Sequence, residues 1–368
     1  MKKIIEHIFL FVLTFAIFSC KEVYDPELHI TKQLLVVEGL ITQEPVSHTI
    51  LLSKAVQFDT TSFEPEKGAS VFVTDNSGMR YYFNETSSGK YTSDPTQFKP
   101  EFLKTYVLTV ETADKKIYTS SPQKLLPKEN FDSVSYIVKN EQYTQTTDGV
   151  FRMKELKGIE FYTSLYSLGG DQYYRFSNTV LVQYTMYQHL GEGYLFYCWK
   201  KYWPNEIFNL NFNEDIHSEN ISHDLGFYPM DSVFYSIIST SDMLKLGEKV
   251  IPAQVDRRLI SYIVSFKQYH LNTDIYQYYS LINKQLSAKQ RILDPLFFQI
   301  KGNMTCTSNS EEPVLGLFEV SSYTNLTYSL LPAIFNDKVT LKKIPPLNMD
   351  TIPDTGMSYF SYPNFWAY

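Results

Sequence analysis

The sequence predicts a mainly β protein, in which an N-terminal immunoglobulin-like or transthyretin-like β-sandwich precedes a larger β-rich domain with one helix. Tyr and Phe are abundant, with 29 and 26 copies among 368 residues, and aromatic and β-branched side chains favour pleated, half-buried surfaces. Short apolar or alternating runs also recur between turn residues at intervals of roughly 8–12 residues, which is typical of sandwiches.

The first series of runs predicts one domain over residues 34–127. Its strands are expected at residues 34–41, 48–55, 69–74, 79–83, 89–92, 105–112 and 117–120. The turn-forming residues Asp75-Asn76-Ser77-Gly78 separate two of these runs and predict a β-hairpin. The stretch PQKLLP (122–127) marks the end of the domain.

The second series predicts a larger domain over residues 128–368. Its strands are expected at residues 132–138, 157–168, 173–187, 259–270, 297–304, 314–321 and 328–335. Residues 205–228 are polar and irregular, and predict a long loop.

One helix is expected, over about residues 274–291. Asp274 and Gln277 have the spacing of a capping box, with Asp274 as the N-cap. Apolar residues follow at helical spacing. Asp294-Pro295 ends the helix, because a residue before proline avoids the helical region.

The N-terminus predicts export and a lipid anchor. Two lysines precede the apolar run IFLFVLTFAIF (8–18), which is too short to span a bilayer, and Ser19-Cys20 follow it. This order predicts a lipoprotein signal over residues 1–19, acylation of Cys20, and a polar tether over residues 20–33. An ordinary cleaved signal or a short membrane anchor with a chance cysteine is the alternative.

The remaining cysteines are Cys198 and Cys306. An exported chain meets an oxidising compartment, so a disulfide between them is one expectation. Two unpaired, buried cysteines are the other.

No catalytic residue, metal ligand or cofactor site is predicted. The pair His217 and His223 matches no standard zinc spacing and is better explained as part of a polar surface loop. No phosphate loop, nucleophile elbow or His-Glu-x-x-His motif occurs in the sequence.

Aromatic residues gather at two places, YLFYCWKKYW (194–203) and the C-terminal YFSYPNFWAY (359–368). Most of those in the first run are expected to be core residues. Trp199, Trp203 and Trp366 are the candidates for ligand or partner contact, because indole rings suit stacking and interfaces. Chain ends are usually polar and mobile, so the aromatic tail is expected to dock on its own domain or on a partner.

The net charge also limits the partners. The chain carries 33 Lys and Arg against 40 Asp and Glu, which gives a formal net charge of −7. Nucleic acids and anionic lipid surfaces are bound through basic patches, so neither is expected as the main partner. The predicted link to a membrane is the lipid on Cys20.

Several motifs resemble the signatures of a known family. LVVEGLIT (35–42), GASV (68–71) and GKY (89–91) resemble its N-terminal signature, and GN (302–303) and EPVLGLF (312–318) resemble its C-terminal one. The family is an uncharacterised outer-membrane lipoprotein family of Bacteroidota, known as a domain of unknown function. The resemblance implies a gene often found beside a TonB-dependent receptor, and it supplies no catalytic residues.

The expected function is therefore non-enzymatic. The protein is predicted to be a lipid-anchored outer-membrane protein, facing the cell exterior, that partners a TonB-dependent transporter in ligand capture or uptake; the ligand is not identified. Lys21-Glu22 after the lipid cysteine resembles the surface-export signal of that phylum. A structural subunit of an outer-membrane assembly or protein-export complex is the alternative, and an extracellular hydrolase is a third.

Overall fold

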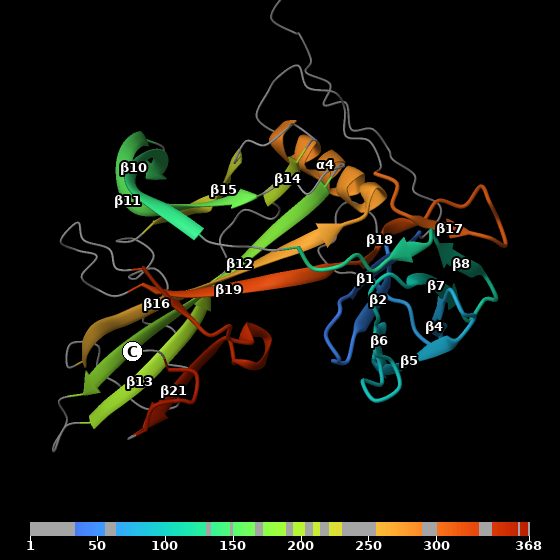
Figure 1. Cartoon of the computed structure of the whole chain (residues 1–368), viewed down its shortest axis with the longest axis horizontal. Coiled ribbons are helices and arrows are strands. Elements are labelled where there is room, and N and C mark those ends of the chain that lie inside the picture. The colour runs from blue at the N-terminus through green and yellow to red at the C-terminus, as the bar shows by residue number, and fades with distance from the viewer. Residues whose placement is uncertain are drawn as a thin grey trace, which may run out of the picture.

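The computed structural model describes a mainly β protein with two side-by-side parts and one long helix (Figure 1). The described residues are 34–55, 64–129, 134–147, 150–165, 172–188, 194–202, 209–213, 221–229, 255–288, 300–330, 341–359 and 361–366. The predicted fold class is confirmed. Within these residues, no helix is long and apolar enough to cross a membrane.

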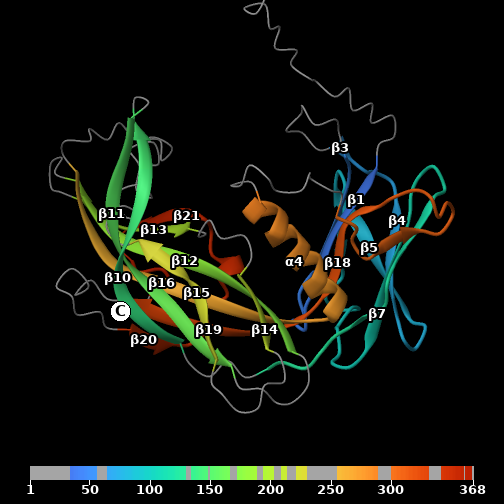
Figure 2. The same ribbon diagram turned by 90° about the horizontal axis from the view of Figure 1, so that it is seen from above.

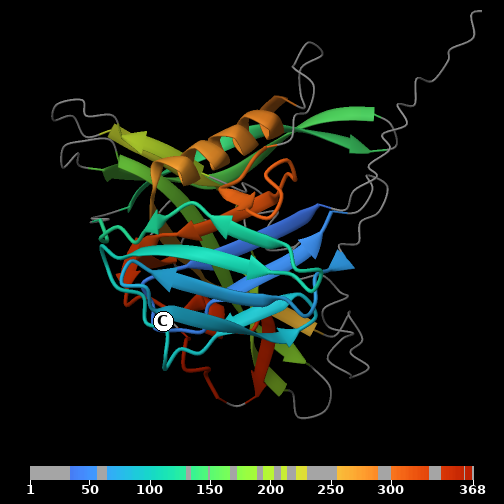
Figure 3. The ribbon, with the colours of Figure 1, turned by 90° about the vertical axis from the view of Figure 1, so that its right-hand side faces the viewer.

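The N-terminal part is sandwich-like. Its strands are β1 (Leu35–Ile41), β2 (Thr49–Lys54), β3 (Glu64–Pro65), β4 (Ser70–Asp75), β5 (Arg80–Ser87), β6 (Lys90–Ser93), β7 (Thr105–Glu111), β8 (Ile117–Ser120) and β9 (Gln123–Lys124). They belong to one 11-stranded sheet (Figure 3). The sheet encloses a core of alternate apolar side chains, including Val37, Ile50 and Leu108. The strict alternation of buried and partly exposed residues in β7 confirms the strand that its period-2 pattern predicts.

The predicted hairpin is present and is held by Asp75. Its carboxylate accepts hydrogen bonds from the backbone N–H groups of Ser77 (2.9 Å) and Met79 (3.0 Å), in the manner of an Asx turn. Gly78 has φ +85°, which favours glycine. The turn chemistry therefore fixes the β4–β5 connection.

Two strands from late in the chain complete the sandwich sheet. β17 (Met304–Cys306) pairs antiparallel with β8, and β18 (Leu315–Val320) pairs parallel with β1. Residues 304–320 therefore belong to the sheet of the first part, although the predicted division at residue 128 places them in the second.

The second part contains two sheets. The three-stranded sheet has the order β10 (Val134–Thr147), β11 (Val150–Leu165), β15 (Ile221–Pro229). The seven-stranded sheet consists of β12 (Gln172–Gln188), β13 (Tyr194–Tyr202), β14 (Asn209–Asn213), β16 (Val255–Leu271), β19 (Ser322–Leu330), β20 (Leu341–Ile344) and β21 (Thr355–Tyr359). A 3-10 turn, η3 (Met349–Thr351), lies between the last two strands.

These two sheets share an apolar core, in which Ile159 and Phe161 of β11 pack with Phe266 of β16 and other buried residues. The prediction of a long loop over residues 205–228 is wrong, because β14 and β15 lie there. β14 reads NLNFN, so polar residues dominate it, and it pairs with residues 172–176 of β12.

The helix α4 (Thr273–Ala288) lies between the sandwich and the seven-stranded sheet (Figure 2). Its predicted capping box is wrong. The first helical hydrogen bond runs from the Tyr276 N–H to the Asn272 carbonyl (3.1 Å), and Gln277 is exposed. The Asp274 carboxylate instead accepts hydrogen bonds from Ser121 Oγ (2.9 Å) and Gln123 Nε2 (2.6 Å), which fixes the start of α4 to the sandwich.

His48 is expected to make the protein less stable in mild acid. It is buried against Phe98, and this burial lowers its pKa from 6.5 to about 4, although a hydrogen bond to the Glu44 backbone opposes the shift. Between pH 6.5 and about pH 4, His48 binds a proton in the unfolded chain but stays neutral in the folded chain. The resulting stabilisation is complete above pH 6.5 and is lost towards pH 4, an effect of about 3 kcal/mol.

Urea denaturation at pH 7 and at pH 4 measures this loss. A His48→Gln variant removes the titrating group, so its stability should fall less than that of the wild type over the same range. Equal losses in the two proteins would show that His48 is not responsible.

Candidate functional site

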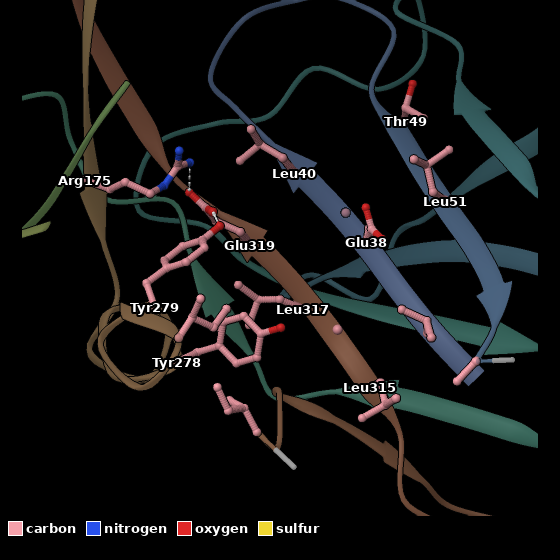
Figure 4. A pocket seen from close by; sticks show the side chains of 16 residues that line it. Glu38, Leu40, Thr49, Leu51, Arg175, Tyr278, Tyr279, Leu315, Leu317 and Glu319 are labelled. Atoms are coloured by element: carbon pink, nitrogen blue, oxygen red, sulfur yellow. Dashed lines mark hydrogen bonds and ion pairs between the residues drawn. The ribbon is translucent and has the colours of Figure 1, made fainter. Parts of the chain in front are cut away.

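A groove of about 750 Å³ lies between the outer face of the sandwich sheet and the helix α4 (Figure 4). β2, β1 and β18 supply its floor, because side chains that alternate with the core residues of these strands point outwards. Tyr278, Tyr279 and Ile282 of α4 line the opposite side. The groove therefore lies on the face of the sheet that points away from the sandwich core.

The floor of the groove is mostly apolar. Leu40, Leu51 and Leu315 stand on three neighbouring strands, and Leu51 is 42% exposed. Outward positions of a solvent-facing strand are normally polar. Leu40 packs against the apolar cluster that joins α4 to β18, whereas Leu51 remains exposed on the groove floor.

Glu38 is the exposed charge on this floor. It stands on β1, and the described residues form no ion pair with it. Burial raises the pKa of the Tyr278 hydroxyl on the facing helix, and the Glu38 carboxylate raises it further. The groove thus combines apolar walls with one negative charge.

The inner end of the groove is closed by the buried ion pair of Arg175 and Glu319. Arg175 Nη2 lies 2.9 Å from Glu319 Oε1. Arg175 comes from β12 and Glu319 from β18, so the pair joins the two parts of the protein. The guanidinium also lies over the rings of Tyr269 (4.0 Å to the centroid) and Tyr279 (5.1 Å).

Glu319 accepts hydrogen bonds from three side chains. Besides Arg175, its carboxylate accepts hydrogen bonds from Tyr279 Oη and from Ser321 Oγ (2.7 Å). Burial disfavours the charge on Arg175, but the nearby Glu319 outweighs it and raises the pKa of Arg175. Burial and the Glu319 charge likewise raise the pKa of Tyr279. Both shifts keep Arg175 charged and the Tyr279 hydroxyl protonated, so these two groups are suited to support the groove and not to transfer protons.

Neither Arg175 nor Glu319 was identified from the sequence. Each is a charged residue inside an otherwise apolar or aromatic run, YYRF in β12 and GLFEV in β18. That signal shows an anomaly in each strand, but it cannot show that the two residues meet, since 144 positions separate them.

The predicted contact residues lie away from the groove. Trp199 and Trp366 are 8% and 7% exposed, and both belong to a core cluster with Leu181 of β12 and Ile263 of β16. Trp199 Nε1 donates to the Pro353 carbonyl (3.2 Å), and its ring packs edge-on against Phe365. The prediction that these two indoles are exposed for a ligand or partner is wrong, whereas Trp203 lies outside the described residues.

The aromatic tail docks on its own chain, which confirms one of the two predicted outcomes. β21 pairs with β13, and Tyr197 packs against Trp366 with 5.5 Å between ring centroids. Gly356 of β21 permits the close pairing with β13, because a Cβ there would lie 2.0 Å from the ring of Trp199 on β13. The predicted exposed surface is therefore an internal packing surface.

Cys198 and Cys306 are buried in different cores and are not joined by a disulfide. The expectation of a bridge is wrong, because Cys198 lies on β13 and Cys306 lies on β17 of the sandwich sheet. Cys20 lies outside the described residues, as does His217. Among the described residues, no group of three or more His, Cys, Asp or Glu side chains could hold a metal ion.

Comparisons with known proteins give a family and no function. No curated protein matches the chain. A family model described as a domain of unknown function, DUF4249, matches residues 21–327, and this span contains the sandwich, the groove and α4. The chain therefore belongs to the DUF4249 family.

Proposed function

We propose that this protein is a lipid-anchored, non-enzymatic binding protein of the outer membrane that captures a ligand beside a TonB-dependent receptor. The groove between α4 and the sandwich is the single observation that carries the binding role. Its apolar floor and the Glu38 carboxylate suit an elongated, mainly apolar ligand with a positively charged group.

The anchoring part of this proposal rests on the sequence. A basic start, an apolar run and Ser19-Cys20 occur in the order of a lipoprotein signal. The outer-membrane location and the receptor partner rest on the resemblance of the sequence motifs to the Bacteroidota lipoprotein family. Replacing Cys20 by Ser in the cell should release the protein from the membrane fraction.

The arrangement of charges supports binding over catalysis. A general acid or base needs an accessible proton site with a pKa near the working pH. In the groove, Glu319 already accepts from Arg175, Tyr279 and Ser321, whereas Glu38 is exposed on the open floor. A role as a structural subunit is the second candidate, and the long β10–β11 hairpin favours it.

A matched pair of substitutions tests the groove. Leu51→Asp places a charge on the apolar floor, while Ile117→Asp makes the same type of change at a residue of similar exposure (39%) on β8, outside the groove lining. The lipid-anchored protein is extracted in mild detergent, and the molecules that co-purify are identified by mass spectrometry.

Leu51→Asp is expected to lower the amount of captured ligand at least about tenfold, because a bound apolar ligand would cover the new carboxylate and leave it without a partner. Ile117→Asp should leave it unchanged, and Glu38→Gln should weaken retention of cationic molecules. Equal retention by the two Asp variants would rule out the groove as the binding site.

A further inference from the structure

The outer edge of β10 is the longest open strand edge of the three-stranded sheet. β10 pairs with β11 along its whole length, from Val134 opposite Thr163 to Thr147 opposite Val150. Within the described part of the chain, no strand pairs with the other side of β10. β15 supports β11 only from Gly158 onwards, so the outer half of the hairpin is a two-stranded ribbon.

The part of β10 that β11 and β15 support exposes side chains on both of its faces. Ile137 and Val138 are consecutive strand residues, so their side chains point to opposite faces, yet they are 48% and 38% exposed. An isolated two-stranded ribbon is marginally stable in water. Proteins usually protect edge strands by proline, short length or charged side chains, especially Lys. β10 has 14 residues and no proline, and its only charged residues are Lys139 and Glu141.

The sequence of β10 is complementary to itself in one antiparallel register. With Asn140 opposite Asn140 of a second copy, Lys139 stands opposite Glu141, and the symmetry forms this pair twice. Ile137 then stands opposite Tyr143, a β-branched and aromatic pair of the kind that stabilises sheets. Registers centred on Lys139 or on Glu141 instead place like charges opposite each other.

We propose that this edge is a self-association surface, on which a second copy of the chain adds its own β10 in the register centred on Asn140. The main-chain groups of the two edges pair with each other, and the two three-stranded sheets become one six-stranded sheet. Lys139 also contacts Glu160 of its own β11, so the new carboxylate joins an existing ion pair.

Charge reversal provides a specific test. Two differently tagged copies are produced together in the cell as lipid-anchored proteins and extracted in mild detergent, and their co-purification is measured. Lys139→Glu alone puts Glu opposite Glu, and Glu141→Lys alone puts Lys opposite Lys. Each variant is expected to weaken its own self-association about tenfold or more.

A mixture of the two variants is decisive, because every facing pair is then opposite in charge. Co-purification should return when one tagged copy carries Lys139→Glu and the other carries Glu141→Lys. A defect in folding cannot produce this recovery. Lys343→Glu changes an exposed lysine on another edge strand, β20, and should leave self-association unchanged.

An independent variant locates the symmetry axis. Asn140→Cys should form a disulfide with the same residue of the second copy under mild oxidation, since the two positions face each other. A wild-type protein that does not associate with itself would overturn the proposal. So would a dimer that is insensitive to both charge variants, or capture of a different protein's strand by β10.

Discussion

Replacing Arg175 by Met is expected to lower the free energy of unfolding by about 3–5 kcal/mol. The substitution removes the guanidinium but leaves the Glu319 carboxylate, which is 2% exposed, without its cation. An unpaired buried charge costs several kcal/mol, and the donors from Tyr279 and Ser321 offset only part of it. Chemical denaturation of the full chain, followed by fluorescence, measures the change.

The same substitution at an exposed site is the control. Arg80 is exposed and lies over the Phe72 ring at 5.0 Å, so Arg80→Met should cost less than about 1 kcal/mol. Adding Glu319→Gln to Arg175→Met removes the stranded charge and should recover part of the stability. Similar losses for Arg175→Met and Arg80→Met would contradict the role assigned to the ion pair.

Replacing Gly316 by Ala is expected to cost more than about 4 kcal/mol and to disturb the pairing of β18 with β1. Gly316 has φ +84°, a conformation that strains any L side chain. A Cβ there would also lie 1.9 Å from the Val37 carbonyl oxygen on the neighbouring strand. Backbone atoms cannot move aside as a flexible side chain can, so β18 must shift.

Gly78 separates the two causes. It has nearly the same φ, +85°, but nothing lies within 4 Å of its would-be Cβ. Gly78→Ala should therefore show only the conformational cost of about 1–2 kcal/mol. If the two alanine variants are equally stable in urea denaturation, the close approach of β1 and β18 has no energetic importance.

The first part of the fold was largely predictable from the sequence. Strands β1, β2, β4 and β7 were predicted to within one or two residues, β1 and β2 from apolar runs and β4 and β7 from period-2 patterns. β14 was missed because polar residues dominate it. β18 was expected as a strand, whereas the strand predicted over residues 297–304 overlaps β17 only at Met304. The partners of both strands were not predicted, since pairing between segments so far apart in the sequence leaves no local signal.

The candidate site was much less predictable. The groove depends on the outward residues of three strands that meet only in the folded chain, and on a helix whose start is fixed by Ser121 and Gln123. The two aromatic runs do mark a packed region, but the prediction that their indole rings contact a ligand or partner was wrong. Trp199 and Trp366 stack within the chain, because the tail returns to cover β13. Composition indicated aromatic packing and could not indicate what the rings pack against.

The late return of β17 and β18 has a consequence for how the chain acquires its structure. A polypeptide that is made, or crosses a membrane, from its N-terminus exposes β1 and β8 long before their partner strands emerge. Pairing of distant segments is slow, because a large loop must close first. The sandwich sheet of the N-terminal part is therefore completed only after β17 and β18 have emerged. Any chain that stops before residue 315 leaves β1 without its parallel neighbour.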